Sequence, residues 1–300
     1  MVLAAAALWG STGTAQTLVA GHMSPYWVGA LRLLVASAFF FVLDFAGGRP
    51  KHTAAAMDSS SQLLALASGV AIAIYNLSFF AGVQLSGVGV GTAIAIGSGP
   101  IWAGLLQATL TKVAPRLDWW LGTLLAVAGG FMLTAGDPAG PRGLLNGLWL
   151  CLLAGLAYSS YALISQRLVR RCAPSVALRW VFVVAATIAI PLAVLLDGAF
   201  SPTLASWMVV VYLGVVATGV SYLLFAHALQ HISGATGVTL ALAEPVTAFV
   251  LAVLLLDYKP AGLGYLGIAF VLAGLLVVAR AELRGGARAA SARSASTSSL

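Results

Sequence analysis

The 300-residue chain has very few charged side chains, and this scarcity narrows the classes of protein to which it can belong. Asp, Glu, Lys and Arg together make up 8% of the residues, whereas hydrophobic residues make up 61%. A soluble protein usually carries about 25% charged residues. So few charges cannot cover the surface of a soluble fold of this length, so a soluble protein is excluded. Only two cysteines are present, Cys151 and Cys172, which is too few for a disulfide framework.

What the chain does have is a series of long apolar runs. A helix needs about 20 residues to cross a bilayer, and the runs reach that length. Glycine, serine and proline gather in several of the joints between them, as helical hairpins require. The sequence therefore predicts an all-α polytopic membrane protein with ten transmembrane helices near Val2–Ala20, Tyr26–Phe45, Gln62–Val83, Gly87–Leu110, Asp118–Ala135, Gly143–Ile164, Ser175–Leu196, Leu204–Ala228, Ile232–Leu256 and Ala261–Arg280.

The distribution of positive charge predicts which side of the membrane each loop occupies. With a cytoplasmic N-terminus, the outside loops hold only Arg142 and Lys259. The inside segments then hold eleven cations: Arg49, Lys51, Lys112, Arg116, Arg167, Arg170, Arg171, Arg280, Arg284, Arg288 and Arg293. Cytoplasmic loops are the ones enriched in Lys and Arg, so both termini are predicted to be cytoplasmic. The formal charge of +7 does not indicate a nucleic-acid partner, since no basic stripe with interleaved aromatics lies outside the apolar runs.

The second half of the chain repeats the first with an offset of about 145 residues. The stretch from Leu121 to Gly129 is echoed from Leu266 to Gly274. Each half contains five apolar runs, and an odd number of crossings forces the halves into opposite orientations. We therefore expect two inverted five-helix repeats, 1–140 and 141–283, followed by a disordered cytoplasmic tail at 284–300 that has nothing large to bury.

Two prolines occupy equivalent points of the repeat, inside the fourth and ninth predicted helices. Pro100 and Pro245 each remove a helical hydrogen bond, and the freed carbonyl needs another partner or a wet cavity. Paired helix breaks at corresponding positions favour a binding site that takes part in movement. The alternative is an ordinary kink with no ligand nearby.

Glu244 is the only acidic residue well inside a predicted span. A central carboxylate is costly, so it should face a cavity or a partner. It could couple proton movement, balance the charge of a bound ammonium group, or pair for structure with Arg32, Arg179 or His227. The first half has Gly99 at the equivalent position, so this feature breaks the symmetry of the repeat.

Polar and aromatic residues form stripes that recur in both halves, which favours a shared central cavity. Aromatic residues near helix ends can instead sit at the lipid headgroups. Stripe positions share a helix face by their spacing. We expect the cavity to be lined by Trp9, Thr12 and Gln16 on the first helix, Tyr75, Asn76 and Phe79 on the third, Tyr158 and Tyr161 on the sixth, Tyr222 and Phe225 on the eighth, and Glu244 on the ninth.

Other patterns indicate packing rather than chemistry. Gly122 with Gly129, and Gly267 with Gly274, would let neighbouring helices approach closely. His227 and His231 have the spacing of a two-histidine metal site, but neither a third ligand nor a general-base Glu accompanies them. No metal, cofactor or catalytic residue is expected, and an enzyme is disfavoured.

Several motifs resemble the EamA family of the drug/metabolite transporter superfamily. These are Trp9-Gly10-Ser11-Thr12-Gly13-Thr14 in the first helix, Ser24-Pro25 followed by Gly29-Ala30-Leu31-Arg32-Leu33 at the second, and the prolines of the fourth and ninth. The chain is most similar to YddG-like exporters. The resemblance implies ten helices in two inverted sets, a location in the inner membrane, and a cavity walled by helices 1, 3, 4, 6, 8 and 9.

Residues and resemblance together lead to one functional expectation. We expect a secondary transporter that works by alternating access and exports small metabolites, most of all amino acids, including aromatic or apolar ones. Its expected partners are a small-molecule substrate and membrane lipid. Nucleotide sugars or cationic drugs are alternative solutes, and a channel or an intramembrane enzyme is the alternative from another class.

Overall fold

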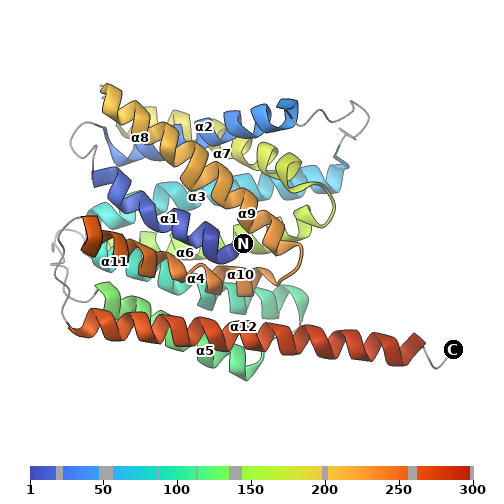
Figure 1. Ribbon diagram of the computed structural model, residues 1–300. Coiled ribbons are helices and arrows are strands. Elements are labelled where there is room, and N and C mark those ends of the chain that lie inside the picture. Colours follow the sequence, from blue (N-terminus) through green and yellow to red (C-terminus); the bar gives the residue numbers. More distant parts are fainter. Residues whose placement is uncertain are drawn as a thin grey trace.

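The computed structural model describes residues 1–17, 23–46, 57–86, 88–112, 114–134, 144–197, 202–255 and 262–297, and every regular element within these ranges is a helix (Figure 1). Each of the ten expected ranges overlaps at least one of them. The elements are α1 (Val2–Thr17), α2 (Pro25–Ala46), α3 (Ser59–Ser86), α4 (Val88–Thr111), α5 (Leu117–Thr134), α6 (Leu144–Val169), α7 (Pro174–Leu196), α8 (Leu204–Gly214), the π-helix η2 (Val215–Val220), α9 (Ser221–Leu229), α10 (Gly234–Leu240), α11 (Ala243–Leu255) and α12 (Gly262–Thr297).

The helical segments have the length and apolar character that a bilayer requires. Within the described residues, eight segments are long and apolar enough to cross a membrane, and α8, η2 and α9 together form one of them. Two shorter apolar helices, Val2–Ala15 and Leu117–Leu133, fall in α1 and α5. The chain is thus a polytopic all-helical protein, while ten crossings, inverted repeats and the side of each terminus stay predictions.

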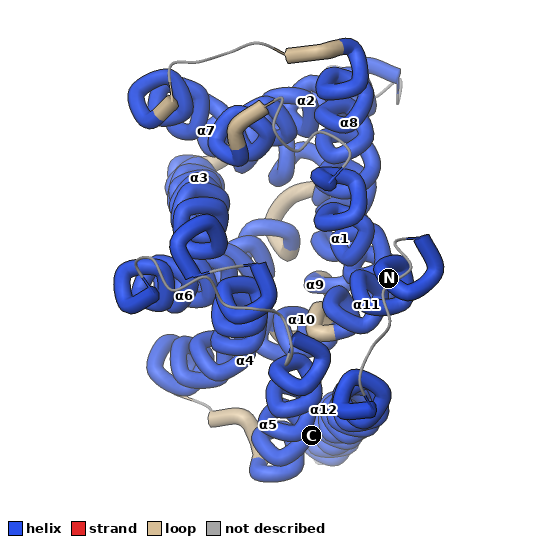
Figure 2. Tube along the Cα trace, turned by 90° about the vertical axis from the view of Figure 1, so that its left-hand side faces the viewer, coloured by secondary structure: helices blue, strands red, loops and turns tan. Residues whose placement is uncertain are grey.

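The helices lie side by side in a bundle. Figure 2 views it along the helices and shows α1, α3, α4, α6, α10 and α11 around the centre, with α5 and α12 together at one edge. Close packing joins α3 to α6, α2 to α7 and α5 to α12. On the side of α2 and α7, Phe40 stacks on Phe182 at 5.6 Å between ring centroids, and both side chains are fully buried.

Glycines allow the backbones of α5 and α12 to touch. A Cβ added at Gly129 would lie 2.6 Å from the carbonyl oxygen of Gly267, and one added at Gly122 would lie 2.9 Å from that of Gly274. Real Cβ atoms do not approach backbone so closely, so larger residues would push the helices apart. The packing role expected for these four glycines is therefore confirmed, and the structure adds that the two pairs pack against each other.

The two prolines of the repeat lie in different surroundings. The helix breaks between Leu240 and Ala243, and Pro245 is the third residue of α11, where the missing N–H is tolerated. In contrast, α4 runs past Pro100 without interruption, which differs from the expected pair of breaks. The Ser159 hydroxyl donates a 2.7 Å hydrogen bond to the carbonyl of Gly99, directly before that proline. The same hydroxyl lies 2.7 Å from the carbonyl of Gly155, and the carbonyl that loses its helical donor at Pro100 is that of Ile96, four residues earlier.

The end of the chain also differs from the expectation. We expect disorder at 284–300, but α12 continues as helix to Thr297. The expectation considered only what the segment could bury. Alanine and arginine, which supply eight of its seventeen residues, are strong helix formers, and helix propensity acts without burial.

Candidate functional site: a central cavity

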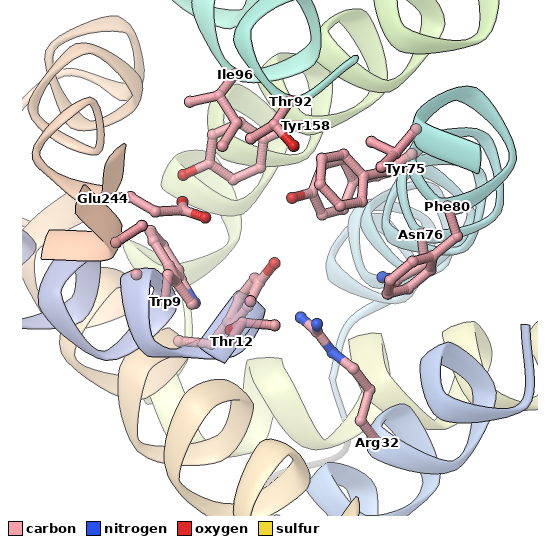
Figure 3. A pocket seen from close by; sticks show the side chains of 16 residues that line it. Trp9, Thr12, Arg32, Tyr75, Asn76, Phe80, Thr92, Ile96, Tyr158 and Glu244 are labelled. Carbon is pink, nitrogen blue, oxygen red and sulfur yellow. The ribbon is translucent and has the colours of Figure 1, made fainter. Parts of the chain in front are cut away.

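A cavity of about 230 Å³ lies at the centre of the bundle, among α1, α2, α3, α4, α6, α9 and α11 (Figure 3). Its described lining contains two oppositely charged side chains and six aromatic ones. The lining residues are Trp9, Gly10, Thr12, Gly13, Arg32, Tyr75, Asn76, Phe79, Phe80, Val83, Thr92, Ile96, Tyr158, Tyr222, Glu244 and Ala248.

The helix break positions the acidic residue. Because α11 begins at Ala243, Glu244 lies in its first turn. The N–H of Glu244 donates a 2.9 Å hydrogen bond to the carbonyl of Ala241, so the chain turns tightly from α10 into α11 at this point. On the facing helix, an added Cβ at Gly10 would lie 2.6 Å from the carbonyl oxygen of Glu244, so α1 closely approaches the start of α11.

Arg32 supplies the opposite charge from the other side of the cavity. Figure 3 shows Glu244 and Arg32 pointing into the cavity from opposite walls. The Arg32 side chain is only 7% exposed, and neither residue forms an ion pair within the part of the chain that the structure describes. The separation keeps both charges available to a third group.

The other two partners considered for the carboxylate are engaged elsewhere. Arg179 forms an ion pair with Asp44, with Nη1 and Oδ2 2.8 Å apart. His227 Nδ1 lies 2.8 Å from the carbonyl oxygen of Leu223, one turn earlier in α9. A structural salt bridge from either residue to Glu244 is therefore absent from the described structure.

Aromatic rings make up much of the wall. The ring of Trp9 lies edge-on to that of Tyr222 at 5.1 Å and to that of Tyr158 at 6.2 Å between centroids. Tyr75 lies 5.5 Å from Tyr158 and 5.7 Å from Phe79. Offset and edge-to-face pairs of this kind hold one another in place, so the wall is preformed and presents ring faces and edges to a ligand.

Three buried donors at the cavity have no protein partner. These are Trp9 Nε1, Tyr158 Oη and Arg32 Nε, none of which has a hydrogen bond to any described residue. Leaving buried polar groups unpaired costs free energy, and such groups usually have partners. Their convergence on one cavity is the arrangement expected of a binding site for a polar ligand.

The cavity extends toward one end of the bundle and is closed toward the other. The residues Phe79 to Val83 lie near the end of α3, and Thr92 and Ile96 lie near the start of α4. In the other direction Tyr161 and Phe225 are fully buried and pack against the ring of Tyr158. These two residues, expected in the lining, instead form the layer beneath it.

The remaining expected residues divide into three groups. Trp9, Thr12, Tyr75, Asn76, Phe79, Tyr158, Tyr222 and Glu244 line the cavity. Pro100 and Pro245 do not, although Glu244 directly precedes Pro245. Gln16 is helical in α1, but its side chain lies outside what the structure describes.

Sequence reasoning placed Arg32 among possible partners of Glu244 but not among the binding residues. Its burial within a span was the available signal, because an intramembrane cation marks a functional position by default. Thr92 and Ile96 were missed altogether. A single threonine in an apolar run leaves no pattern from which its position at a cavity could be read.

Comparison with known proteins places the chain in a family. The sequence matches the EamA-like transporter family over residues 1–135 and again over 145–280. It is 35% identical to the "Uncharacterized transporter YwfM" of Bacillus subtilis over 93% of each chain, and 24% identical to the "Uncharacterized transporter sll0355" of Synechocystis over 92% of this chain and 87% of that one. A crystal structure with 19% sequence identity shares the fold with a TM-score of 0.78, covering 94% of this chain and 96% of the other. The chain therefore belongs to the EamA-like transporter family, within the drug/metabolite transporter superfamily, and is a multi-pass transporter of the cell membrane rather than an enzyme.

Proposed function

We propose that the protein exports small zwitterionic metabolites, above all amino acids with apolar or aromatic side chains. The observation that carries the proposal is the placement of Glu244 and Arg32 on opposite walls of one cavity without an ion pair between them. An ammonium group would be attracted to Glu244 and a carboxylate to Arg32. The aromatic wall between them suits an apolar side chain.

Size and charge favour this class over the alternatives. The cavity of about 230 Å³ is smaller than the roughly 300–1,000 Å³ typical of drug-sized ligands. A nucleotide sugar carries several negative charges, whereas the lining offers one cation, Arg32, and one repelling carboxylate, Glu244. A cationic drug carries positive charge instead, so the buried guanidinium of Arg32 would repel it.

The transport cycle would be alternating access. In this proposal the chain crosses the membrane ten times as two inverted five-helix repeats, 1–140 and 141–283, with both termini in the cytoplasm. The cavity extends toward the end of the bundle that the charge distribution predicts to be external, and Tyr161 and Phe225 close it from the cytoplasm. Movement at the α10–α11 break would open the other side, as discontinuous helices do in inverted-repeat carriers.

Counterflow into proteoliposomes tests the proposal. Vesicles containing the protein are loaded with a high concentration of one unlabelled solute, and uptake of a trace of labelled amino acid is followed. We expect saturable accumulation with apolar and aromatic amino acids, and none with nucleotide sugars or permanently cationic dyes. Flux that never saturates would indicate a channel, and counterflow of nucleotide sugars alone would contradict the substrate class.

A further inference from the structure

A second cavity, of about 300 Å³, lies at the end of the bundle opposite to the one toward which the central cavity extends. The two cavities share no lining residue. The second cavity is formed where α6 and α9 end, beside α4 and α12. Its polar lining includes Gln107, Arg167, Arg170, His231 and Glu282. The charge distribution predicts this end to be cytoplasmic.

Two side-chain amides hold together the segments that form this cleft. Gln166 Nε2 donates to the carbonyl of Ile232 at 2.8 Å, and Gln230 Nε2 donates to that of Val169 at 3.0 Å. These two hydrogen bonds tie the turn between α9 and α10 to the end of α6. His231, in that turn, is therefore held beside the arginines at the end of α6.

The arginines of the cleft are available to a ligand. Arg167 and Arg170 are three residues apart, so they share a face at the end of α6. Both are exposed, and neither forms an ion pair with any residue that the structure describes. An arginine without an acidic partner at the rim of a polar cavity keeps all its donors free for an anion.

Among the described residues that line the cleft, the one carboxylate already has hydrogen-bond partners. Glu282 Oε1 accepts a 2.9 Å hydrogen bond from the backbone N–H of Ser233, and Oε2 accepts one of 2.5 Å from the hydroxyl of Thr236. Its charge is therefore directed at the start of α10 rather than at the arginines. The cleft keeps a net positive character from Arg167 and Arg170.

We propose that this cleft binds a phosphate group at the cytoplasmic surface. Arginine forks match the geometry of phosphate oxygens and form charge-assisted, bidentate hydrogen bonds with them. Basic pockets between helices on the cytoplasmic side of membrane proteins bind the headgroups of anionic lipids. A headgroup phosphate and a soluble phosphate compound offer the same chemistry, so the test has one arm for each.

The test compares anion binding by two charge-matched double variants. Arg167→Gln with Arg170→Gln removes the cleft cations, whereas Arg280→Gln with Arg284→Gln removes two exposed cations of α12 that do not line the cleft. Each purified protein is placed in nanodiscs of phosphatidylcholine. One arm titrates phosphatidylglycerol into the discs, and the other adds pyrophosphate in solution, with Tm and the bound fraction as readouts.

We expect the wild type to bind one of the two anions and to gain Tm with it. The cleft variant should bind at least about tenfold more weakly, because two charge-assisted contacts are lost, while the α12 variant should retain binding. A response to phosphatidylglycerol alone identifies a lipid site, and a response to pyrophosphate identifies a soluble ligand. Equal losses in both variants, or no binding in either arm, overturn the proposal.

The folding control is built into the same experiment. Both arginines are exposed, so the cleft variant should match the wild-type Tm in pure phosphatidylcholine without pyrophosphate. If the double variant is already unstable, the single changes Arg167→Gln and Arg170→Gln are compared with Arg280→Gln. Anion binding that survives in both single variants at the wild-type level also counts against the site.

Discussion

Helix α4 and the pair α10–α11 correspond in the sequence repeat, yet they are built differently. Helix α4 continues through Pro100 and contributes Thr92 and Ile96 to the cavity. The α10–α11 segment breaks before Pro245 and presents a carboxylate in the first turn after the break. Pro100 thus lies within a continuous helix of the wall, whereas Pro245 adjoins the one acidic residue among the described lining residues.

The difference shows what a helix break contributes beyond flexibility. In α4, Gly99 leaves no side chain at the equivalent point, and the hydroxyl of Ser159 reaches its carbonyl instead. In α11 the N–H of Glu244 donates a 2.9 Å hydrogen bond to the carbonyl of Ala241, and Pro245 has no N–H. The break thus places a carboxylate in the first turn of α11, facing the cavity, where continuous α4 has no side chain.

The largest effect is expected when the charge at the break is removed. Glu244→Gln keeps the shape of the side chain but loses the attraction to an ammonium group. Charge-assisted hydrogen bonds contribute about 1.5–3 kcal/mol, so amino-acid affinity should fall about ten- to a hundredfold. Counterflow as a function of substrate concentration measures it.

The matched control for this change lies in the other segment. Thr92→Val alters the lining of α4 without changing charge, and should shift affinity several-fold less. If Thr92→Val weakened transport more than Glu244→Gln, the claim that α11 contributes more to substrate binding than α4 would be contradicted.

The next effect concerns the contact of α1 with the break. Gly10→Ala should displace α11, since the new Cβ would meet the carbonyl of Glu244 and the side chain of Thr247. Overpacking of this kind typically costs about 1–3 kcal/mol. Tm of the purified protein should fall together with transport. Gly130→Ala, where an added Cβ meets nothing within 4 Å, is the control; its Tm should stay at or slightly above the wild-type value, since alanine favours the helix.

Replacing the two prolines should also have different effects on the two segments. In α11, Pro245→Ala supplies an N–H whose helical acceptor, the carbonyl of Ala241, already accepts from the N–H of Glu244, so it should leave the break in place. In α4, Pro100→Ala restores a helical hydrogen bond and should stabilise the helix. We therefore expect Pro100→Ala to raise Tm and slow counterflow, and Pro245→Ala to change each less. The reverse order would mean that the break before α11 depends on Pro245 itself.

The smallest effect is expected where Glu282 contacts the start of α10. Glu282→Gln retains part of the hydrogen bonding to Ser233 and Thr236 but loses the charge that favours the helix N-terminus. Such a charge is typically worth about 0.3–1 kcal/mol. A slight loss of Tm with normal substrate affinity would place this contact outside the binding site. A change in affinity as large as that of Glu244→Gln would instead couple it to the cavity.

Much of this architecture could be predicted from the sequence, because apolar length and small-residue spacing are local signals. The helix ranges and the glycine pairs of α5 and α12 are of this kind. Glu244 stood out because a carboxylate in a span is costly. Features that depend on tertiary packing could not be predicted. Which arginine faces Glu244 depends on how α2 packs against its neighbours. Tyr161 lies on the same helix face as Tyr158, yet it is buried beneath the cavity lining. Whether a proline breaks its helix also depends on tertiary surroundings, since α4 continues past Pro100 whereas a break precedes Pro245.

The measurement that tests the central claim most directly is binding of an amino acid and of its carboxamide, which lacks the negative charge, to the wild type and to Arg32→Gln. If Arg32 binds the carboxylate while Glu244 binds the ammonium group, the wild type should prefer the amino acid, and Arg32→Gln should lose that preference while still binding the carboxamide. Glu244→Gln should weaken both ligands alike. A preference for the amino acid that persists undiminished in Arg32→Gln would contradict the account.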